Sequence, residues 1–500
     1  MTDIARTRWA TRLSPANVAG TVVLAAIPAK LLGERLSDLD LWWHLRTGKY
    51  IVAHHAIPHA DIYSYTAAGK DWVVQEWGSE VILHGIRSAF GLYGILVFRA
   101  VVLLAIYSIV AHLFVQRMGN RLATWGIVGL TAYSGSLNWT ERPNLLSFLL
   151  FVITIELLER RDKRIWLFAP VAVAWANLHG MVVIGVGLVG VVALAEGIKL
   201  WLHWPGADAL WAKRLGLVTA AGAAAILVNP RSLGLVAHAF RLIGVASKLV
   251  TEWASPNFHE IGTLGFLALL LVVIASMAIA RERPDPTDVM LALSFTVIGL
   301  GAVRNLAIAS IVLGLVASRT IPPAVDAIRH RAAEPRPAVG AGSSILLGGT
   351  ALVAALGLMT AVVLTRFPTS DSPGDIINTE YAIAAIDALD NPGVRLFTPE
   401  VWAGMAIDRD WPNVHVFLDS RVDMYGLVLS QAYLRVLNAG PGWANELDDS
   451  CTTHILVRPR DPIAQVLPLS DAWRIARRDR RSITFVRTHD VSGCPVLPPD

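Results

Sequence analysis

The sequence has little charge for its length. Only 16% of its 500 residues are charged, while 54% are hydrophobic. Soluble domains carry about 25% charged residues, so the composition indicates a membrane protein with many spans. The net charge of +4 does not indicate nucleic acid, because the basic residues stand in short loops between apolar runs, where they set topology. We therefore expect no nucleic-acid partner.

The sequence also lacks several familiar motifs. It has no P-loop, no GxSxG and no HExxH, so nothing in it resembles an ATP-driven pump. The first apolar run, 18–32, lacks a small-x-small cleavage site and is predicted to be a signal anchor. The only two cysteines, Cys451 and Cys494, both lie in the polar C-terminal segment. A disulfide is expected there if the segment is exported, and two ordinary thiols if it is not.

Apolar runs dominate the first three quarters of the chain. A helix needs about 17–25 residues to cross a bilayer, and the candidate spans are 16–33, 93–115, 122–138, 144–158, 165–178, 181–201, 215–229, 263–280, 287–302, 304–318 and 343–365. Several are short, so the count carries an uncertainty of one or two. The sequence therefore predicts a mainly α fold, a polytopic transmembrane helical bundle of about 11 spans.

The basic loops predict the orientation of these spans. With the basic N-terminus in the cytoplasm, the clusters ERRDKR (159–164) and RERPDP (281–286) also fall on the cytoplasmic side, as the positive-inside rule requires. The large first loop (34–92) and the C-terminal region are then exported. Abundant Ala, Val, Arg and Gly favour a bacterial source. The predicted location is the bacterial inner (plasma) membrane, with a cytoplasmic N-terminus and an extracytoplasmic C-terminal domain.

Two domains are predicted. Residues 1–366 form the transmembrane domain, and residues 367–500 form a small exported α/β domain. In the latter, β-like runs alternate with helical stretches, as is typical of small α/β folds. The runs are 394–398, 414–420, 454–459 and 482–488, and the helical stretches are 379–389, 425–438 and 440–449. Asp419, Arg421 and Asp423 would share one side of a strand and form a local salt-bridged edge.

The first exported loop begins with acids and aromatics. In DLDLWWHLR (38–46), Asp38 and Asp40 precede Trp42 and Trp43. We expect an amphipathic helix on the membrane interface, with its tryptophans in the headgroup belt. The paired acids could bind a divalent cation (Mg²⁺ or Mn²⁺) or act as a general base, or Asp38 could only cap the helix. His44 and Arg46 follow within two turns, near enough to contact a phosphate.

Further polar residues belong to the same face. Glu76 and Glu80 in QEWGSE add a second pair of carboxylates to the first loop. Charged groups at membrane depth usually face a cavity or a partner, and guanidinium binds phosphate bidentately. Each arginine alone could be an interfacial snorkel, but three on one face predict an anionic ligand such as a phosphate or diphosphate. The candidate binding residues at the span ends are Arg142, His179, Arg231, Glu252 and Arg304.

This layout resembles the GT-C superfamily of integral-membrane glycosyltransferases, which take sugars from polyprenyl-phosphate or polyprenyl-diphosphate carriers. The segment 38–46 is similar to the first-loop motif of oligosaccharyltransferase catalytic subunits, in which an acid precedes an aromatic pair and a basic residue. The chain also resembles a bacterial group of membrane proteins with a QEWGSE-type segment and a VWAGM…FLDSRVDMYG tail. The resemblance implies that Asp40 or Asp38 is the catalytic acid or base, that Glu76 or Glu80 is a second carboxylate, and that the arginines hold the lipid-linked phosphate.

One departure limits the acceptor. Oligosaccharyltransferases carry a WWDYG-type acceptor motif, whereas VWAGM (401–405) lacks its acid, so N-glycosylation of peptides is not expected. The predicted function is transfer of a sugar from a polyprenyl-phosphate-type donor to an envelope glycan, lipid or protein acceptor on the extracytoplasmic face. The expected partners are the lipid bilayer and that polyprenyl-linked donor. The alternatives are a transporter or flippase of a lipid-linked saccharide, which would place polar groups mid-span, and an envelope-assembly scaffold.

Overall fold

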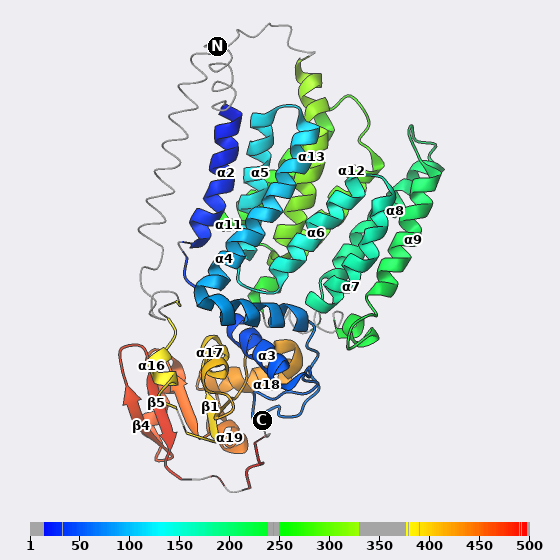
Figure 1. The fold of residues 1–500 in the computed structure, drawn as a ribbon. Coiled ribbons are helices and arrows are strands. Elements are labelled where there is room, and N and C mark those ends of the chain that lie inside the picture. Colours follow the sequence, from blue (N-terminus) through cyan, green and yellow to red (C-terminus); the bar gives the residue numbers. More distant parts are fainter. Residues whose placement is uncertain are drawn as a thin grey trace, which may run out of the picture.

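The computed structural model describes residues 15–32, 34–238, 244, 250–329, 377–378, 380–389, 391–489, 491 and 493–497. A long helical bundle carries a smaller region of sheet and short helices at one end (Figure 1). The predicted run 343–365, the basic N-terminus and the predicted domain boundary at residue 366 lie outside the described residues.

The apolar runs that are described all form helices. These are α2 (Pro15–Leu32), α4 (Trp77–Met118), α5 (Arg121–Gly135), α6 (Asn144–Glu159), α7 (Phe168–Leu178), α8 (Val182–Trp201), α9 (Ala209–Ala225), α11 (Ile261–Ile279), α12 (Pro286–Gly301) and α13 (Leu306–Arg329). In the described part of the chain, only α4, α8, α11 and α13 are long and apolar enough to cross a membrane, and α2 and α12 are shorter apolar helices. The structure thus supports a bundle with several spans and does not confirm a count of about 11.

Helix α4 is kinked at Gly91, and the part before the kink covers one end of the bundle. Gly91 has a φ of 65° inside this helix, a left-handed conformation that glycine adopts without the penalty a Cβ would bring. Residues before Gly91 run across the end of the bundle and residues after it run through the bundle (Figure 1). The second half packs beside α13, whose residues are largely buried among its neighbours. The first half therefore forms a platform between the bundle and the sheet region.

The first-loop helix α3 (Leu41–His54) lies against this platform. Its tryptophans were predicted in the headgroup belt, and the structure corrects this: Trp42 is 1% exposed and Trp43 is 8% exposed. The ring of Trp42 meets Tyr381 edge-on, and Trp43 Nε1 donates to Ser420 Oγ over 3.0 Å. Because the C-terminal region covers the face of α3 turned away from α4, the aromatic pair becomes protein core instead of a lipid anchor.

A five-stranded mixed sheet forms the C-terminal region, in the order β2-β1-β3-β5-β4. Strands β1 (Val394–Phe397), β2 (Val414–Val416) and β3 (His454–Val457) are parallel, while β5 (Ile483–Arg487) pairs antiparallel with β3 and β4 (Trp473–Arg478). Around the sheet lie α16 (Ile383–Ile386), α17 (Glu400–Asp410), α18 (Val422–Leu437), α19 (Trp443–Asp449) and α20 (Pro462–Val466). The four predicted strands are present, whereas β4, α17 and α20 were not predicted.

The strand predicted at 414–420 is shorter than expected. It ends at Val416, and α18 begins at Val422, so Asp419 and Arg421 lie in the connection and not on a strand face. They do form the predicted salt bridge. The first loop reaches this edge, because Val416 donates its N–H to the carbonyl of Tyr63 over 3.0 Å. The first loop and the sheet thereby share one hydrophobic core.

Candidate functional site

A pocket of about 250 Å³ lies where the bundle end, the first loop and the C-terminal region meet. Most of the residues predicted from sequence line it: Asp40, His44, Glu76, Glu80, Arg142, His179, Glu252 and Arg304. They come from the first loop and from the ends of bundle helices that are far apart in the chain. The pocket is partly open and its lining is both polar and apolar, which suits a polar headgroup attached to an apolar body.

Arg142 stands at the centre of one half of this pocket. Its Nε lies 2.5 Å from Asp38 Oδ2 and 3.3 Å from Asp40 Oδ2. Its Nη1 donates to both oxygens of Glu252, over 3.1 and 3.2 Å. Arg304 Nη1 lies 3.5 Å from Oε1 of the same glutamate, and its guanidinium lies over the ring of Trp253.

The two aspartates of the first-loop motif differ in position. Asp38 is buried behind Arg142, and its Oδ1 accepts the N–H of Asp40 over 2.9 Å. Burial raises the pKa of Asp38 to about 7, against the lowering effect of Arg142. Asp40 is the N-cap residue of α3, makes no side-chain capping bond, and faces the pocket. Of the two acids, Asp40 is therefore the one within reach of a bound molecule.

A buried ion pair holds this acidic segment in place. Glu141 accepts the backbone N–H groups of Ser37 and Asp38, over 2.8 and 3.2 Å, and its other oxygen lies 2.7 Å from Arg99. Both partners are almost fully buried. This ion pair was not predicted, because Arg99 lies inside an apolar run and Glu141 stands beside a more conspicuous arginine.

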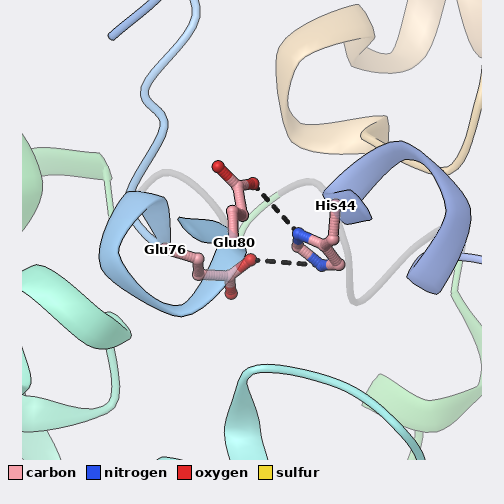
Figure 2. Close-up of side chains that lie close together, drawn as sticks. All are labelled: His44, Glu76 and Glu80. Carbon is pink, nitrogen blue, oxygen red and sulfur yellow. Dashed lines mark hydrogen bonds and ion pairs between the residues drawn. The ribbon is translucent and has the colours of Figure 1, made fainter. Parts of the chain in front are cut away.

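A histidine–carboxylate cluster forms the other half of the pocket. His44 projects between Glu76 and Glu80 (Figure 2), with Nδ1 3.0 Å from Glu80 Oε1 and Nε2 3.4 Å from Glu76 Oε2. The other oxygen of Glu76 lies 3.0 Å from His179 Nε2. Burial opposes charge on His44, but the hydrogen bond to Glu80 and the charges of both glutamates outweigh it and raise its pKa. Burial likewise opposes charge on Glu76, yet the hydrogen bond from His179 and the nearby histidines lower its pKa to about 2.

The same cluster fits a divalent cation. Among the described residues, His44, Glu76 and Glu80 are the only group of three or more candidate ligands whose atoms lie within 4.8 Å of one another. Glu80 Oε2 is buried without a hydrogen-bond partner, so it has lone pairs to offer. One imidazole nitrogen with carboxylate oxygens is a ligand set that Zn²⁺ and Mn²⁺ accept. The predicted metal ligands Asp38 and Asp40 instead face Arg142.

Two predicted binding residues lie away from this pocket. The guanidinium of Arg46 stacks 4.9 Å from the ring centre of Trp411 and donates to the carbonyl of the same residue. Arg231 pairs with Asp71 over 2.9 Å and donates to the carbonyl of His59 over 2.9 Å. Both arginines attach the first loop to neighbouring segments, Arg46 to the C-terminal region and Arg231 to the loop after α9.

The C-terminal region contributes three residues that were not predicted to belong to the site. Glu400, Arg421 and Asp423 all line the pocket. Burial, with the nearby charge of Asp40, raises the pKa of Glu400 to about 7. Glu400 directly precedes VWAGM, the segment compared above with an acceptor motif and found to lack an acid. An acid one residue upstream was the signal available in the sequence.

Known proteins resemble this chain in structure and not in sequence. No protein-family model and no curated protein matches it. The archaeal oligosaccharyltransferase AglB from Archaeoglobus fulgidus, solved with an inhibitory peptide and a dolichol-phosphate, superposes with a TM-score of 0.57 at 9% identity, over 88% of this chain and 69% of AglB. ArnT from Cupriavidus metallidurans, bound to undecaprenyl phosphate, superposes with a TM-score of 0.51 at 11% identity, over 95% of this chain and 98% of ArnT.

The chain has a GT-C-like fold. The agreement extends over most of its length, including the bundle and the C-terminal region, and with the apolar helices it supports a multi-pass membrane protein. At 9–12% identity the likeness concerns the fold, and function has to be argued from the site.

Proposed function

We propose that this GT-C-like protein is a membrane glycosyltransferase that moves a sugar from a polyprenyl-phosphate-type donor to an envelope glycan, lipid or protein acceptor. The observation that carries the proposal is the pocket at the bundle end that Asp40, Glu252 and Arg304 line together. Transfer of a sugar from a lipid phosphate requires a base for the acceptor hydroxyl and a positive charge for the leaving phosphate, and a carboxylate and an arginine in one pocket can provide both. ArnT and AglB, which share the fold, were solved with polyprenyl-type phosphates bound.

In this mechanism Asp40 accepts the proton of the acceptor hydroxyl. The hydroxyl oxygen attacks the anomeric carbon of the sugar, and the bond from that carbon to the phosphate oxygen breaks. The electron pair stays on the phosphate, whose charge is stabilised by Arg304. The N-terminus of α6 also borders the pocket through Pro143 and Asn144, and helix N-termini favour anions. Asp38 is too enclosed to meet the acceptor, so it positions Asp40 through the bond between them.

A divalent cation held by His44, Glu76 and Glu80 would supply further positive charge near the leaving group. Without assuming such an ion, these residues still order the wall of the pocket, because His44 ties α3 to the start of α4 through both glutamates. His179 extends the same network to the end of α7.

The pocket is proposed to open on the extracytoplasmic side of a bacterial inner membrane. The basic loops predict this orientation. The bond between Cys451 and Cys494 supports it, since disulfides persist in oxidising compartments.

The test is glycan profiling of cells that carry Asp40→Asn, Asp38→Asn or the wild type at matched membrane expression. Asp40→Asn should lower product by about 10²-fold or more, the usual contribution of a general base. Asp38→Asn should lower it less, because it acts through Asp40. Asp326→Asn, an exposed position on α13, should leave the product unchanged. If Asp40→Asn matches the wild type, the carboxylate is not the base, and the transporter or scaffold alternative gains support.

A further inference from the structure

Three carboxylates converge on one guanidinium in the pocket. Asp38 and Asp40 meet Arg142 Nε, and Glu252 meets Nη1 with both oxygens. The acids come from two segments more than two hundred residues apart, and Arg142 comes from a third, at the start of α6. The Asp38 side chain is 2% exposed and that of Arg142 is 19% exposed. Asp40 is 19% exposed and Glu252 is 32% exposed, so the cluster is buried at Asp38 and opens to the pocket at Glu252.

Such a cluster needs a cation. Carboxylates gathered in a partly buried site repel one another, and a buried charge without a partner is strongly destabilising. A divalent cation would draw the oxygens to about 2.0–2.6 Å from a single point. A guanidinium instead spreads its donors over a planar fork and satisfies carboxylates that stay farther apart. In the described part of the chain, the one group with ligand spacing suited to an ion is His44, Glu76 and Glu80.

We propose that Arg142 is the built-in cation of this carboxylate site, so that Asp38, Asp40 and Glu252 do not bind a divalent metal ion in the wild-type protein. The guanidinium neutralises part of the acidic charge and fixes the direction of the Asp40 carboxylate. Arg142 is thereby a positioning residue. This disagrees with the expectation that the first-loop acids form a metal site.

Arg142 and Arg304 then have different roles in the pocket. Arg142 donates to three carboxylates, so it is not the free phosphate ligand that the sequence predicted. Arg304 lies farther from Glu252, at 3.5 Å, and stacks over Trp253, so it can meet an anion in the pocket. Arg421, which also lines the pocket, is paired with Asp61 and Asp419. The role of Arg304 as a phosphate ligand rests on the proposed function. The proposal that Asp38, Asp40 and Glu252 bind no divalent metal ion is independent of it.

The experiment counts Mn²⁺ ions bound to the purified full-length protein in detergent, by electron paramagnetic resonance, without any substrate. Arg142→Ser should gain one bound Mn²⁺ relative to the wild type, because it empties the centre of the cluster. Arg142→Ser with Glu252→Gln should lose that gain, and Arg142→Lys should not show it. Any ion held at His44 contributes equally to all of these proteins.

A second comparison requires no change at Arg142. Asp40→Asn should bind as many Mn²⁺ ions as the wild type does. Loss of an ion in Asp40→Asn, or no gain in a folded Arg142→Ser, would overturn the proposal. Neither reading involves sugar transfer, so a protein that proved not to be a glycosyltransferase would still give a clear answer here.

Discussion

Arg421 joins the first loop to the C-terminal region through a buried charge. Its Nη2 lies 2.8 Å from Asp61 Oδ1 and 2.6 Å from Asp419 Oδ2, and the three side chains are at most 2% exposed. Its guanidinium also lies 4.3 Å from the ring centre of Trp72. Buried ions are tolerated when they are paired and hydrogen-bonded, and the aromatic face adds a cation–π contact.

Replacing this arginine should therefore cost much stability. Arg421→Met leaves the carboxylates of Asp61 and Asp419 buried without their cation, and the expected loss is about 3–5 kcal/mol. Arg435→Met is the matched control on α18, the helix that Arg421 directly precedes. Arg435 and its partner Glu446 are both partly exposed, and such pairs contribute about 0–1 kcal/mol. Thermal unfolding of the purified proteins measures both. Equal unfolding temperatures for the two variants would contradict the argument.

Individual site residues could be predicted where one short segment carries them. DLDLWWHLR and QEWGSE place acids beside aromatics in a membrane protein, and the structure brings Asp40, His44 and Glu76 to one pocket. Glu400 and Arg421 were not proposed for the site, since they reach it only because the tail folds back over α3. A local pattern contains no information about that long-range contact, and the alternating charges of 419–423 favoured a strand face, whereas β2 ends before them at Val416.

At the scale of elements, the close crossing of α3 and α4 builds the histidine side of the pocket. Gly48 lies so near α4 that a Cβ at this position would be 2.0 Å from the carbonyl oxygen of Glu80. The missing side chain lets the two helices approach until His44 Nδ1 is 3.0 Å from Glu80. The crossing thus depends on glycine at one position on α3.

Gly48→Ala should separate these two helices. Overpacking of this kind typically costs about 1–3 kcal/mol, and the shift should weaken the contact of His44 with Glu80 and lower activity together with thermal stability. Gly85→Ala on α4 is the control, since a Cβ there meets nothing within 4 Å and alanine favours a helix by about 0.5–1 kcal/mol over glycine. If Gly48→Ala were as stable and active as Gly85→Ala, the close crossing would not matter.

The elements themselves were largely predictable for a simple reason. Long apolar runs in a membrane protein form helices because their backbone groups must be satisfied internally, and the described runs do so. The kink at Gly91 and the burial of Trp42 and Trp43 were not predictable in this way. The first depends on a single backbone conformation, and the second depends on which surface covers α3.

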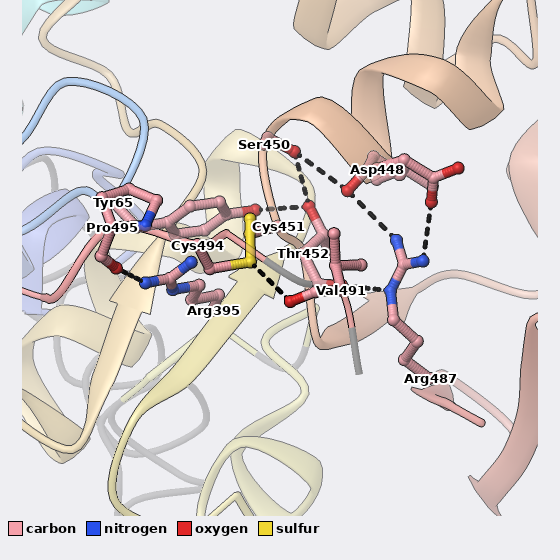
Figure 3. Close-up of a disulfide and its surroundings, with 11 residues drawn as sticks. Tyr65, Arg395, Asp448, Ser450, Cys451, Thr452, Arg487, Val491, Cys494 and Pro495 are labelled. Atoms are coloured by element: carbon pink, nitrogen blue, oxygen red, sulfur yellow. Dashed lines mark hydrogen bonds and ion pairs between the residues drawn. A yellow bond between two sulfur atoms is a disulfide. The ribbon is translucent and has the colours of Figure 1, made fainter. Parts of the chain in front are cut away.

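At the scale of the whole molecule, the C-terminal region is attached to the bundle through the first loop. Tyr65 and Thr452 share a hydrogen bond of 2.8 Å between their hydroxyl groups (Figure 3), and Ser64 pairs with Val416 at the edge of the sheet. The neighbouring Cys451 is bonded to Cys494, 43 residues further along the chain. The disulfide therefore lies in the same folded region as the C-terminal residues that line the pocket, such as Glu400 and Arg421.

The disulfide gives a prediction that joins stability to location. If the C-terminal domain is extracytoplasmic, as proposed, both cysteines should resist alkylation in intact cells until a reductant is added, read as a mass shift on a non-reducing gel. Replacing both with serine should lower the free energy of unfolding by about 2–4 kcal/mol, the usual effect of a disulfide. Unfolding of the double-serine variant should begin in the segment around Cys494, which is otherwise attached through the hydrogen bond from Arg395 to the carbonyl of Pro495. If the cysteines of wild-type cells were alkylated without a reductant, the C-terminal domain would lie in a reducing compartment. That result would contradict the proposed orientation, and with it sugar transfer on the extracytoplasmic face. It would not affect the fold.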